Sequence, residues 1–153
     1  MPGARHFLSP LLAARSSACT LVNARTGAVL ATTLEPAVDS RSRRQGLLGR
    51  AFLSPTSALV LAPCNAVHTW FMKFPLDIVC VRRDGRVVKI ARDVPPWRVV
   101  LSWSAFAVIE WRSGALAGCD IAPGDALRVE RSSAFSAPEQ ITICPASDSQ
   151  NVQ

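Results

Sequence analysis

The sequence predicts a mainly β fold: a single jelly-roll-like sandwich or partly closed barrel with two short helices. Its apolar segments are short, and Gly, Pro and Asp separate them at close intervals, which is typical of small sandwiches and barrels. The chain has 153 residues, enough for one domain with a sizeable core. No apolar run reaches the roughly 18 residues that span a bilayer, so we expect no membrane span.

The two ends of the chain differ from the middle in composition. Residues 1–18 combine basic residues with a short apolar stretch that Pro10 interrupts, and we expect a mobile leader there. A weak secretory signal is the alternative for this leader. Residues 132–153 are rich in Ser, Ala, Pro and Gln and predict a flexible tail. The folded domain is therefore expected over residues 19–131.

The first half of the predicted domain contains four strands and one helix. Residues 20–23 and 28–34 flank a turn with a glycine, which predicts a strand, a turn and a strand. Asp39 or Ser40 can cap a short helix over residues 41–48. Two further strands are expected over residues 58–62 and 66–72, and side-chain alternation along the second should place three residues on one face: His68, Trp70 and Met72.

The clearest local signal is a hairpin in the second half. Residues 76–82 and 86–92 flank Asp84-Gly85, a pair that supplies the positive φ values of a tight turn. Three further strands are expected over residues 99–103, 105–111 and 126–130, and one helical turn over residues 114–117.

Charge and cysteine content restrict the function classes. The net charge is +6, and the 17 basic residues are spread along the chain rather than gathered in one block. They indicate either solvated surface or a general attraction to anionic partners. The five cysteines are odd in number and contain no C-x-x-C pair, so we expect no disulfide framework and no zinc site. Free thiols favour a cytoplasmic protein.

A set of motifs occurs in a characteristic order along the chain. The motifs are Arg43-Arg44-Gln-Gly-Leu-Leu-Gly-Arg50, His68-Thr-Trp-Phe-Met-Lys73, Pro75-Leu-Asp77, Asp84-Gly-Arg-Val-Val88, Pro96-Trp-Arg98, Val108-Ile-Glu-Trp and Ile121-Ala-Pro-Gly-Asp125. Together, from about residue 20 to residue 131, they resemble the Domain of Unknown Function 192 family of prokaryotes. The resemblance implies a compact, mainly β domain of jelly-roll-like sandwich type, and it implies no assigned reaction.

Two polar residues near the middle of the chain are candidates for chemistry. His68 and Asp77 could support proton transfer, because imidazole titrates near neutral pH and a carboxylate can orient it. His68 could instead be a core histidine. Asp77 could be a buried carboxylate held by Lys73, Arg98 or turn amides, because an unpaired buried charge is costly.

A second candidate group follows two prolines. Pro95 and Pro96 should make a stiff corner that carries Trp97 and Arg98. An aromatic ring beside a guanidinium can hold a carboxylate, a sugar or a base. Alternatively, the Trp fills the end of the sandwich and the Arg pairs with a structural acid. The predicted ligand-binding site comprises His68, Trp70, Lys73, Asp77, Trp97 and Arg98.

Three functions are open, in this order. The first is a non-enzymatic binding or accessory module for a small anionic or carbohydrate-like ligand or for a protein partner. The second is a hydrolase or isomerase that uses His68 and Asp77. The third is nucleic-acid binding through dispersed Arg and the four Trp. The sequence contains no phosphate-binding glycine loop, and we expect no cofactor and no metal.

Overall fold

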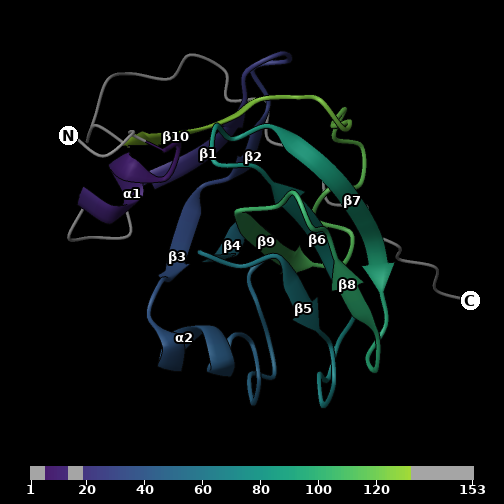
Figure 1. Ribbon diagram of the computed structural model, residues 1–153. Coiled ribbons are helices and arrows are strands. Elements are labelled where there is room, and N and C mark those ends of the chain that lie inside the picture. Colours follow the sequence, from purple (N-terminus) through teal and green to yellow (C-terminus); the bar gives the residue numbers. More distant parts are fainter. Residues whose placement is uncertain (1–5, 14–18, 132–153) are drawn as a thin grey trace, which may run out of the picture.

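The protein folds in three layers, seen here in a computed structural model that describes residues 6–13 and 19–131. A five-stranded sheet occupies the middle, and a smaller layer covers each of its faces (Figure 1). No sheet formed by the described residues closes into a barrel. The mainly β sandwich with two short helices is confirmed, and its jelly-roll character stays a prediction.

The central sheet is built around two strands that are almost entirely buried. β9 (Ala107–Arg112) is the middle strand, and β6 (Leu76–Val81) lies beside it. Every residue of β6 is buried, because both faces of the strand are covered. The remaining strands are β3 (Thr33–Ala37), β4 (Ser57–Leu61) and β7 (Val87–Val94), in the sheet order β3-β4-β9-β6-β7.

Side-chain alternation along these strands divides the core in two. Leu76 and Ile78 of β6 belong to one apolar cluster, whereas Val79 and Val81 belong to another. Trp111 of β9 is fully buried in the second cluster. The two faces of the central sheet therefore support separate cores, and residues one position apart point into different ones.

One face of the central sheet is covered by a three-stranded sheet and a helix. That sheet contains β10 (Leu127–Arg131), β1 (Cys19–Asn23) and β2 (Val29–Ala31). Helix α1 (Ser9–Ala13) packs against it, and Leu8 and Leu11 are buried in the core. The expectation of a mobile leader is therefore wrong for residues 6–13. The other leader residues and the predicted tail lie outside the described residues.

The opposite face carries a helix and a two-stranded sheet. Helix α2 (Ser40–Gln45) begins after Asp39, whose carboxylate accepts the N–H groups of Arg41 and Ser42 as the predicted N-cap. The small sheet pairs β5 (Ala66–His68) with β8 (Val99–Leu101). α2 and β5 stand side by side below the central sheet in Figure 1.

Several predicted elements differ in their ends. The hairpin of β6 and β7 is confirmed. The strand predicted over residues 66–72 ends at His68, because Thr69 turns away to bond with the backbone of Arg98. Met72 is consequently buried while His68 and Trp70 are exposed, so the predicted common face is wrong. The strand predicted over 28–34 divides into β2 and β3, and the helical turn predicted over 114–117 is a run of turns, so α1 is the second helix.

The cysteines do not all follow the expectation. Cys19, Cys64 and Cys80 are free thiols, whereas Cys119 is disulfide-bonded. The expectation of free thiols is therefore wrong at Cys119. Since disulfides persist mainly in oxidising compartments, the cysteine content no longer favours the cytoplasm over export. Among the described residues, no helix is long and apolar enough to cross a membrane.

Candidate functional site

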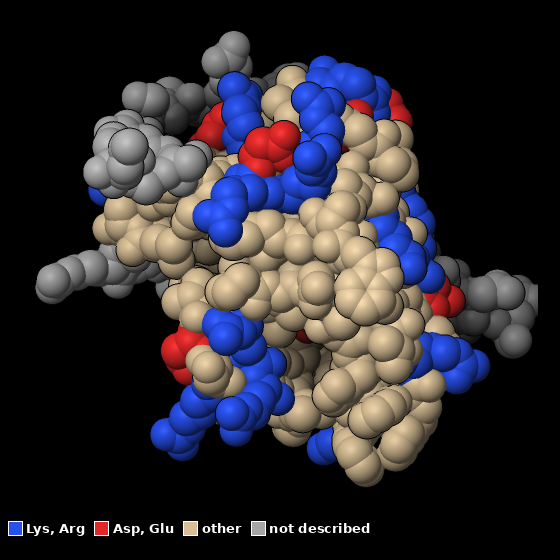
Figure 2. Space-filling model, in the orientation of Figure 1, with Lys and Arg blue, Asp and Glu red and all other residues tan. Residues whose placement is uncertain are grey.

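A pocket of about 390 Å³ lies between α2, β5 and the central sheet. Figure 2 shows it as a hollow with blue Lys and Arg side chains along one side and uncharged surface along the other. Its lining residues are Ser40, Arg43, Arg44, Gln45, Gly46, Leu47, Leu48, Leu61, Cys64, Ala66, Val67, His68, Met72, Leu76 and Glu110. We call this cavity the Glu110 pocket.

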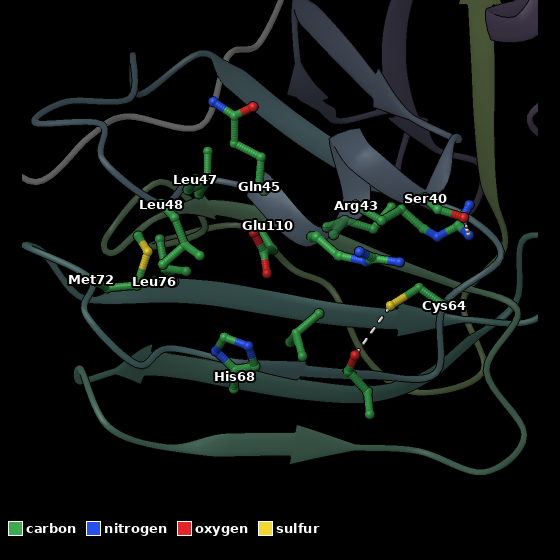
Figure 3. A pocket seen from close by; sticks show the side chains of 15 residues that line it. Ser40, Arg43, Gln45, Leu47, Leu48, Cys64, His68, Met72, Leu76 and Glu110 are labelled. Carbon is green, nitrogen blue, oxygen red and sulfur yellow. Dashed lines mark hydrogen bonds between the residues drawn. The ribbon is translucent and has the colours of Figure 1, made fainter.

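Glu110 gives the pocket its one acidic group. It lies on the central strand β9, between Leu59 of β4 and Ile78 of β6, on the face that belongs to the core below α2 and β5. Its side chain points into the pocket (Figure 3). The residue is 5% exposed.

The carboxyl of Glu110 has no protein partner within the described residues: neither a hydrogen bond nor an ion pair joins it to another side chain or to the backbone. Burial raises its pKa from an ordinary 4.5 to about 7. A buried carboxyl without a partner is costly to keep in a fold. Groups of this kind gather at functional sites, where a ligand supplies the missing partner.

The walls of the Glu110 pocket are largely aliphatic. Leu47 and Leu48 come from the segment after α2, Val67 from β5, and Met72 and Leu76 from the segment that enters β6. Gly46 ends α2 at a φ of 46° and lets the chain turn so that the two leucines enter the core. The pocket is therefore an apolar cleft with few polar groups, which is typical of small-molecule sites.

Cationic groups line the α2 side of the pocket. The guanidinium of Arg43 donates to the carbonyls of Val38 and Ala62, which fixes it beside the cavity. Arg44 is exposed, and no described residue forms an ion pair with it. The pocket thus has an acid within and fixed positive charge at one edge.

Cys64 and His68 line the β5 side of the pocket. The Cys64 thiol donates to the carbonyl of Ala66 at 3.2 Å, and burial raises its pKa, which is the opposite of what a nucleophilic thiolate needs. The imidazole of His68 lies across the cavity from Glu110 (Figure 3) and stacks on Trp70 with 4.8 Å between ring centroids.

The structure brings together four of the six residues predicted as the ligand site. Thr69 is the link: its N–H donates to the carbonyl of Arg98 (2.8 Å), and its hydroxyl accepts the N–H of Arg98 (2.9 Å) and donates to the carbonyl of Pro95 (2.7 Å). These bonds hold the segment after β5 against the corner before β8. His68, Trp70, Trp97 and Arg98 therefore lie in one region, as predicted.

The two other predicted residues are bonded to none of these four. Lys73 is exposed in the same segment, two residues after Phe71, and forms no hydrogen bond or ion pair with a described residue. Asp77 is buried, and its carboxylate accepts three backbone N–H groups, from Asp93 (2.9 Å), Gly114 (3.1 Å) and Leu116 (3.1 Å). These bonds indicate a structural role for Asp77, which was one of the two alternatives that the sequence left open. The partners of its carboxylate are backbone amides rather than Lys73 or Arg98.

His68 and Asp77 cannot act as a pair in this arrangement. Asp77 follows Leu76 in β6, so its side chain points to the opposite face of the central sheet from Leu76, which lines the pocket with His68. The sequence-based proton-transfer pair is therefore corrected: the acid that shares a cavity with His68 is Glu110. The described residues contain no cluster of ligands that could hold a metal ion.

Three charged residues of this pocket are absent from the predicted site: Glu110, Arg43 and its neighbour Arg44. Glu110 had a visible signal, since it is the one charged residue among the first five positions of β9. Arg43 had a weaker one, as part of a basic group that is equally typical of a solvated helix face. Only the folded structure, in which α2 and the Glu110 face of β9 border the same cavity, reveals that these side chains lie together.

Comparisons with known proteins agree on the fold and the family. A protein from Sinorhizobium meliloti 1021, described as a candidate transcription regulator, matches at a TM-score of 0.64 and 24% identity, over 72% of this chain and 91% of that one. A protein of unknown function from Novosphingobium aromaticivorans DSM 12444 matches at a TM-score of 0.62 and 26% identity, over 72% and 82%. No curated protein matches. The model of the DUF192 family, described as uncharacterized ACR, matches residues 21–129, and the chain belongs to that family.

Proposed function

We propose that the protein is a non-enzymatic binding module that holds a small organic anion in the Glu110 pocket. The ligand's apolar body lies along the leucine walls, its anionic group meets the arginines of α2, and a hydroxyl or ammonium group reaches Glu110. The observation that carries this proposal is the carboxyl of Glu110, which is 5% exposed and has no partner among the described residues.

The size and lining of the pocket support a small ligand. A volume of about 390 Å³ falls in the range of sites that enclose a small molecule. The aliphatic walls favour a flexible apolar body over a planar ring. A donor group on the ligand would satisfy Glu110 and offset the cost of its burial.

The charges of the pocket set the polarity of the ligand. A second anionic group beside Glu110 would be repelled once that carboxyl ionises. The anionic end therefore belongs at the α2 edge, where Arg44 is exposed and unpaired among the described residues. Guanidinium groups bind carboxylates and phosphates well because their geometry allows two parallel hydrogen bonds.

The other ligand classes expected from the sequence fit less well. A sugar stacks on an open aromatic face, but Trp70 lies on His68, and Phe71 meets Trp97 edge-on at 4.7 Å. The arginines are spread along the sequence rather than gathered in one block, and the 24% likeness to a candidate transcription regulator concerns the fold alone. Location in the cytoplasm and binding of a protein partner stay proposals.

Ligand titration tests the proposal. The probes are 6-hydroxyhexanoate and 6-aminohexanoate, with hexanoate as the matched acid that lacks the donor, and binding is followed by amide NMR shifts. The two donor-bearing acids should bind about tenfold or more tightly than hexanoate, because a hydrogen bond to a charged group is worth roughly 1.5–3 kcal/mol. Glu110→Gln should remove that difference, and Arg44→Ala should weaken all three acids.

Arg82→Ala is the control, since Arg82 is exposed at the distant β6–β7 turn. Equal binding of all three acids, or shifts outside the pocket, would overturn the assignment.

An enzymatic alternative rests on Glu110 and His68, which face each other across the pocket (Figure 3). A group that titrates near neutral pH can act as a general acid or base. Product analysis distinguishes the enzyme from the binding module. A binding module should leave 6-hydroxyhexanoate, its esters and its amides unchanged after incubation for hours. Turnover that Glu110→Gln abolishes would replace the binding module by an enzyme.

A further inference from the structure

A group of aromatic residues is exposed at the end of β5 and the start of β8. Trp70 is 45% exposed, Phe71 69% and Trp97 57%, in a chain that buries Trp111 completely. The two loops that carry them project together from one end of the fold (Figure 1). We call these three rings, with the neighbouring cations Lys73 and Arg98, the aromatic tip.

The backbone of the tip is strained. Phe71 has a φ of 62° and Trp97 a φ of 66°, a conformation that bulky residues rarely adopt. A turn that served only to reverse the chain would be more stable with Gly or Asn at these positions. Strain of this kind persists where the side chain is needed at that place, and here the strained residues are the ones whose rings face solvent.

The tip is also rigid. The hydrogen bonds of Thr69 to Arg98 and Pro95 are supplemented by one from the N–H of Trp97 to the carbonyl of Thr69 (3.0 Å). Thr69 itself is 1% exposed. The rings are thus held outward before any partner arrives, which lowers the entropy lost on binding.

The cations of the tip are free to act on a partner. Lys73 forms no hydrogen bond or ion pair with another described residue, and the Arg98 side chain donates only to the carbonyl of its own neighbour, Trp97. None of the ion pairs among the described residues involves either group. Exposed basic and aromatic side chains therefore share the two segments that Thr69 joins, and the chain as a whole carries a charge of +6.

We propose that the aromatic tip docks the protein on an anionic membrane surface. Trp rings favour the boundary between headgroups and acyl chains, and unpaired Lys and Arg are drawn to anionic headgroups. Phe71 packs edge-on against Trp97, and Trp70 stacks on His68, so each ring already has an aromatic neighbour and suits insertion into a membrane surface better than stacking with bases or sugars. The proposal is independent of the ligand of the Glu110 pocket.

Vesicle co-sedimentation tests the proposal. The vesicles contain either phosphatidylcholine alone or phosphatidylcholine with about a third of phosphatidylglycerol. The protein should bind the anionic vesicles, bind neutral ones far less, and lose most binding between about 0.1 M and 0.5 M salt. Lys73→Ala and Arg98→Ala should each weaken binding about fivefold.

Removal of the rings needs a variant that keeps the backbone. Asn tolerates positive φ, so Phe71→Asn and Trp97→Asn remove the rings without added strain. Each should weaken vesicle binding at least about tenfold. Trp103→Asn is the matched control: Trp103 is 83% exposed but lies beyond Leu101, at the other end of the β5–β8 pair.

Absence of binding to anionic vesicles, or an equal loss in Trp103→Asn, overturns the proposal. If sedimentation velocity instead shows a dimer that Trp97→Asn dissociates, the tip is a contact between copies and the membrane assignment is wrong.

Discussion

Glu110 makes stability depend on pH in a definite direction. Its pKa is about 7 in the fold against an ordinary 4.5, so between these values the folded chain holds a proton that the unfolded chain has lost. Stability is therefore highest below about pH 4.5 for this group and falls as pH rises to about 7, by about 3 kcal/mol in all. The other ionisable side chains among the described residues that line the cavity are Arg43, Arg44, Cys64 and His68.

Glu110→Gln should abolish this dependence. Urea denaturation of both proteins at several values from about pH 5 to 8 measures it, and the difference between them cancels all other titrations. Asp125 acts in a separate range, because hydrogen bonds from Arg25 hold its pKa far below the usual value and its contribution is lost only in acid. Parallel curves for the two proteins would contradict the burial of an unpartnered carboxyl.

Asp77 has a purely structural effect. A carboxylate accepts all three N–H groups around it, whereas an amide oxygen accepts at most two and adds donors without acceptors. Asp77→Asn should therefore lower the free energy of unfolding by about 3 kcal/mol and leave ligand affinity unchanged. Asp84→Asn is the control, since Asp84 is exposed in a turn. A similar, small effect of both variants in denaturation would refute the role.

At the level of single residues, part of the site can be predicted from the sequence. The motif around His68 and the prolines before Trp97 correctly indicated side chains that converge. The nearness of Asp77 in the sequence predicts that it joins them. In β6, however, Asp77 follows Leu76 directly, so its side chain points to the opposite face of the sheet. Glu110 is distant in sequence from α2 and β5, and only the strand register brings it into their cavity.

Among the elements, the β5–β8 pair depends on one hydroxyl. Thr69→Val keeps the shape of the side chain but leaves the N–H of Arg98 without its acceptor. Hydrogen exchange at that amide should become at least about fivefold faster, and stability should fall by about 1–3 kcal/mol. Thr20→Val, at a long 3.4 Å contact on β1, should change little. Unaltered exchange at Arg98 would show that Thr69 does not brace the tip.

The β6–β7 hairpin requires glycine at its turn. Gly85 has a φ of 86°, and a Cβ there would lie 2.4 Å from the carbonyl of Leu127. Gly85→Ala should therefore cost at least about 2 kcal/mol in thermal or urea unfolding. Gly27→Ala has a similar φ but open space, so the strain alone should cost about 1 kcal/mol. Equal losses would mean that the close approach of β10 to this turn is absent.

The sequence predicts an element well where the residues that determine it lie within a few positions of one another. Asp84-Gly85 and the cap at Asp39 act within a few residues, and both elements form. The end of β5 at His68 and the packing of α1 depend on distant partners, namely the corner before Trp97 and the sheet of β1 and β10. Sequence periodicity cannot report such contacts.

For the whole molecule, short apolar segments and frequent turns were enough to predict a mainly β sandwich. They could not show that a central sheet separates two cores, because that follows from which strands pair. This division explains the site: the Glu110 pocket enters the core between α2 and β5, on the face of the central sheet opposite to α1 and β1.

The open core makes Glu110 the group on which the proposed function depends, and carbon-13 NMR can follow its carboxyl directly. In the free protein the carboxyl should titrate with a midpoint near pH 7. With saturating 6-hydroxyhexanoate the midpoint should fall, because a hydroxyl that donates to the ionised form favours it. A midpoint near 4.5, unmoved by the ligand, would show that Glu110 is neither buried alone nor part of a binding site.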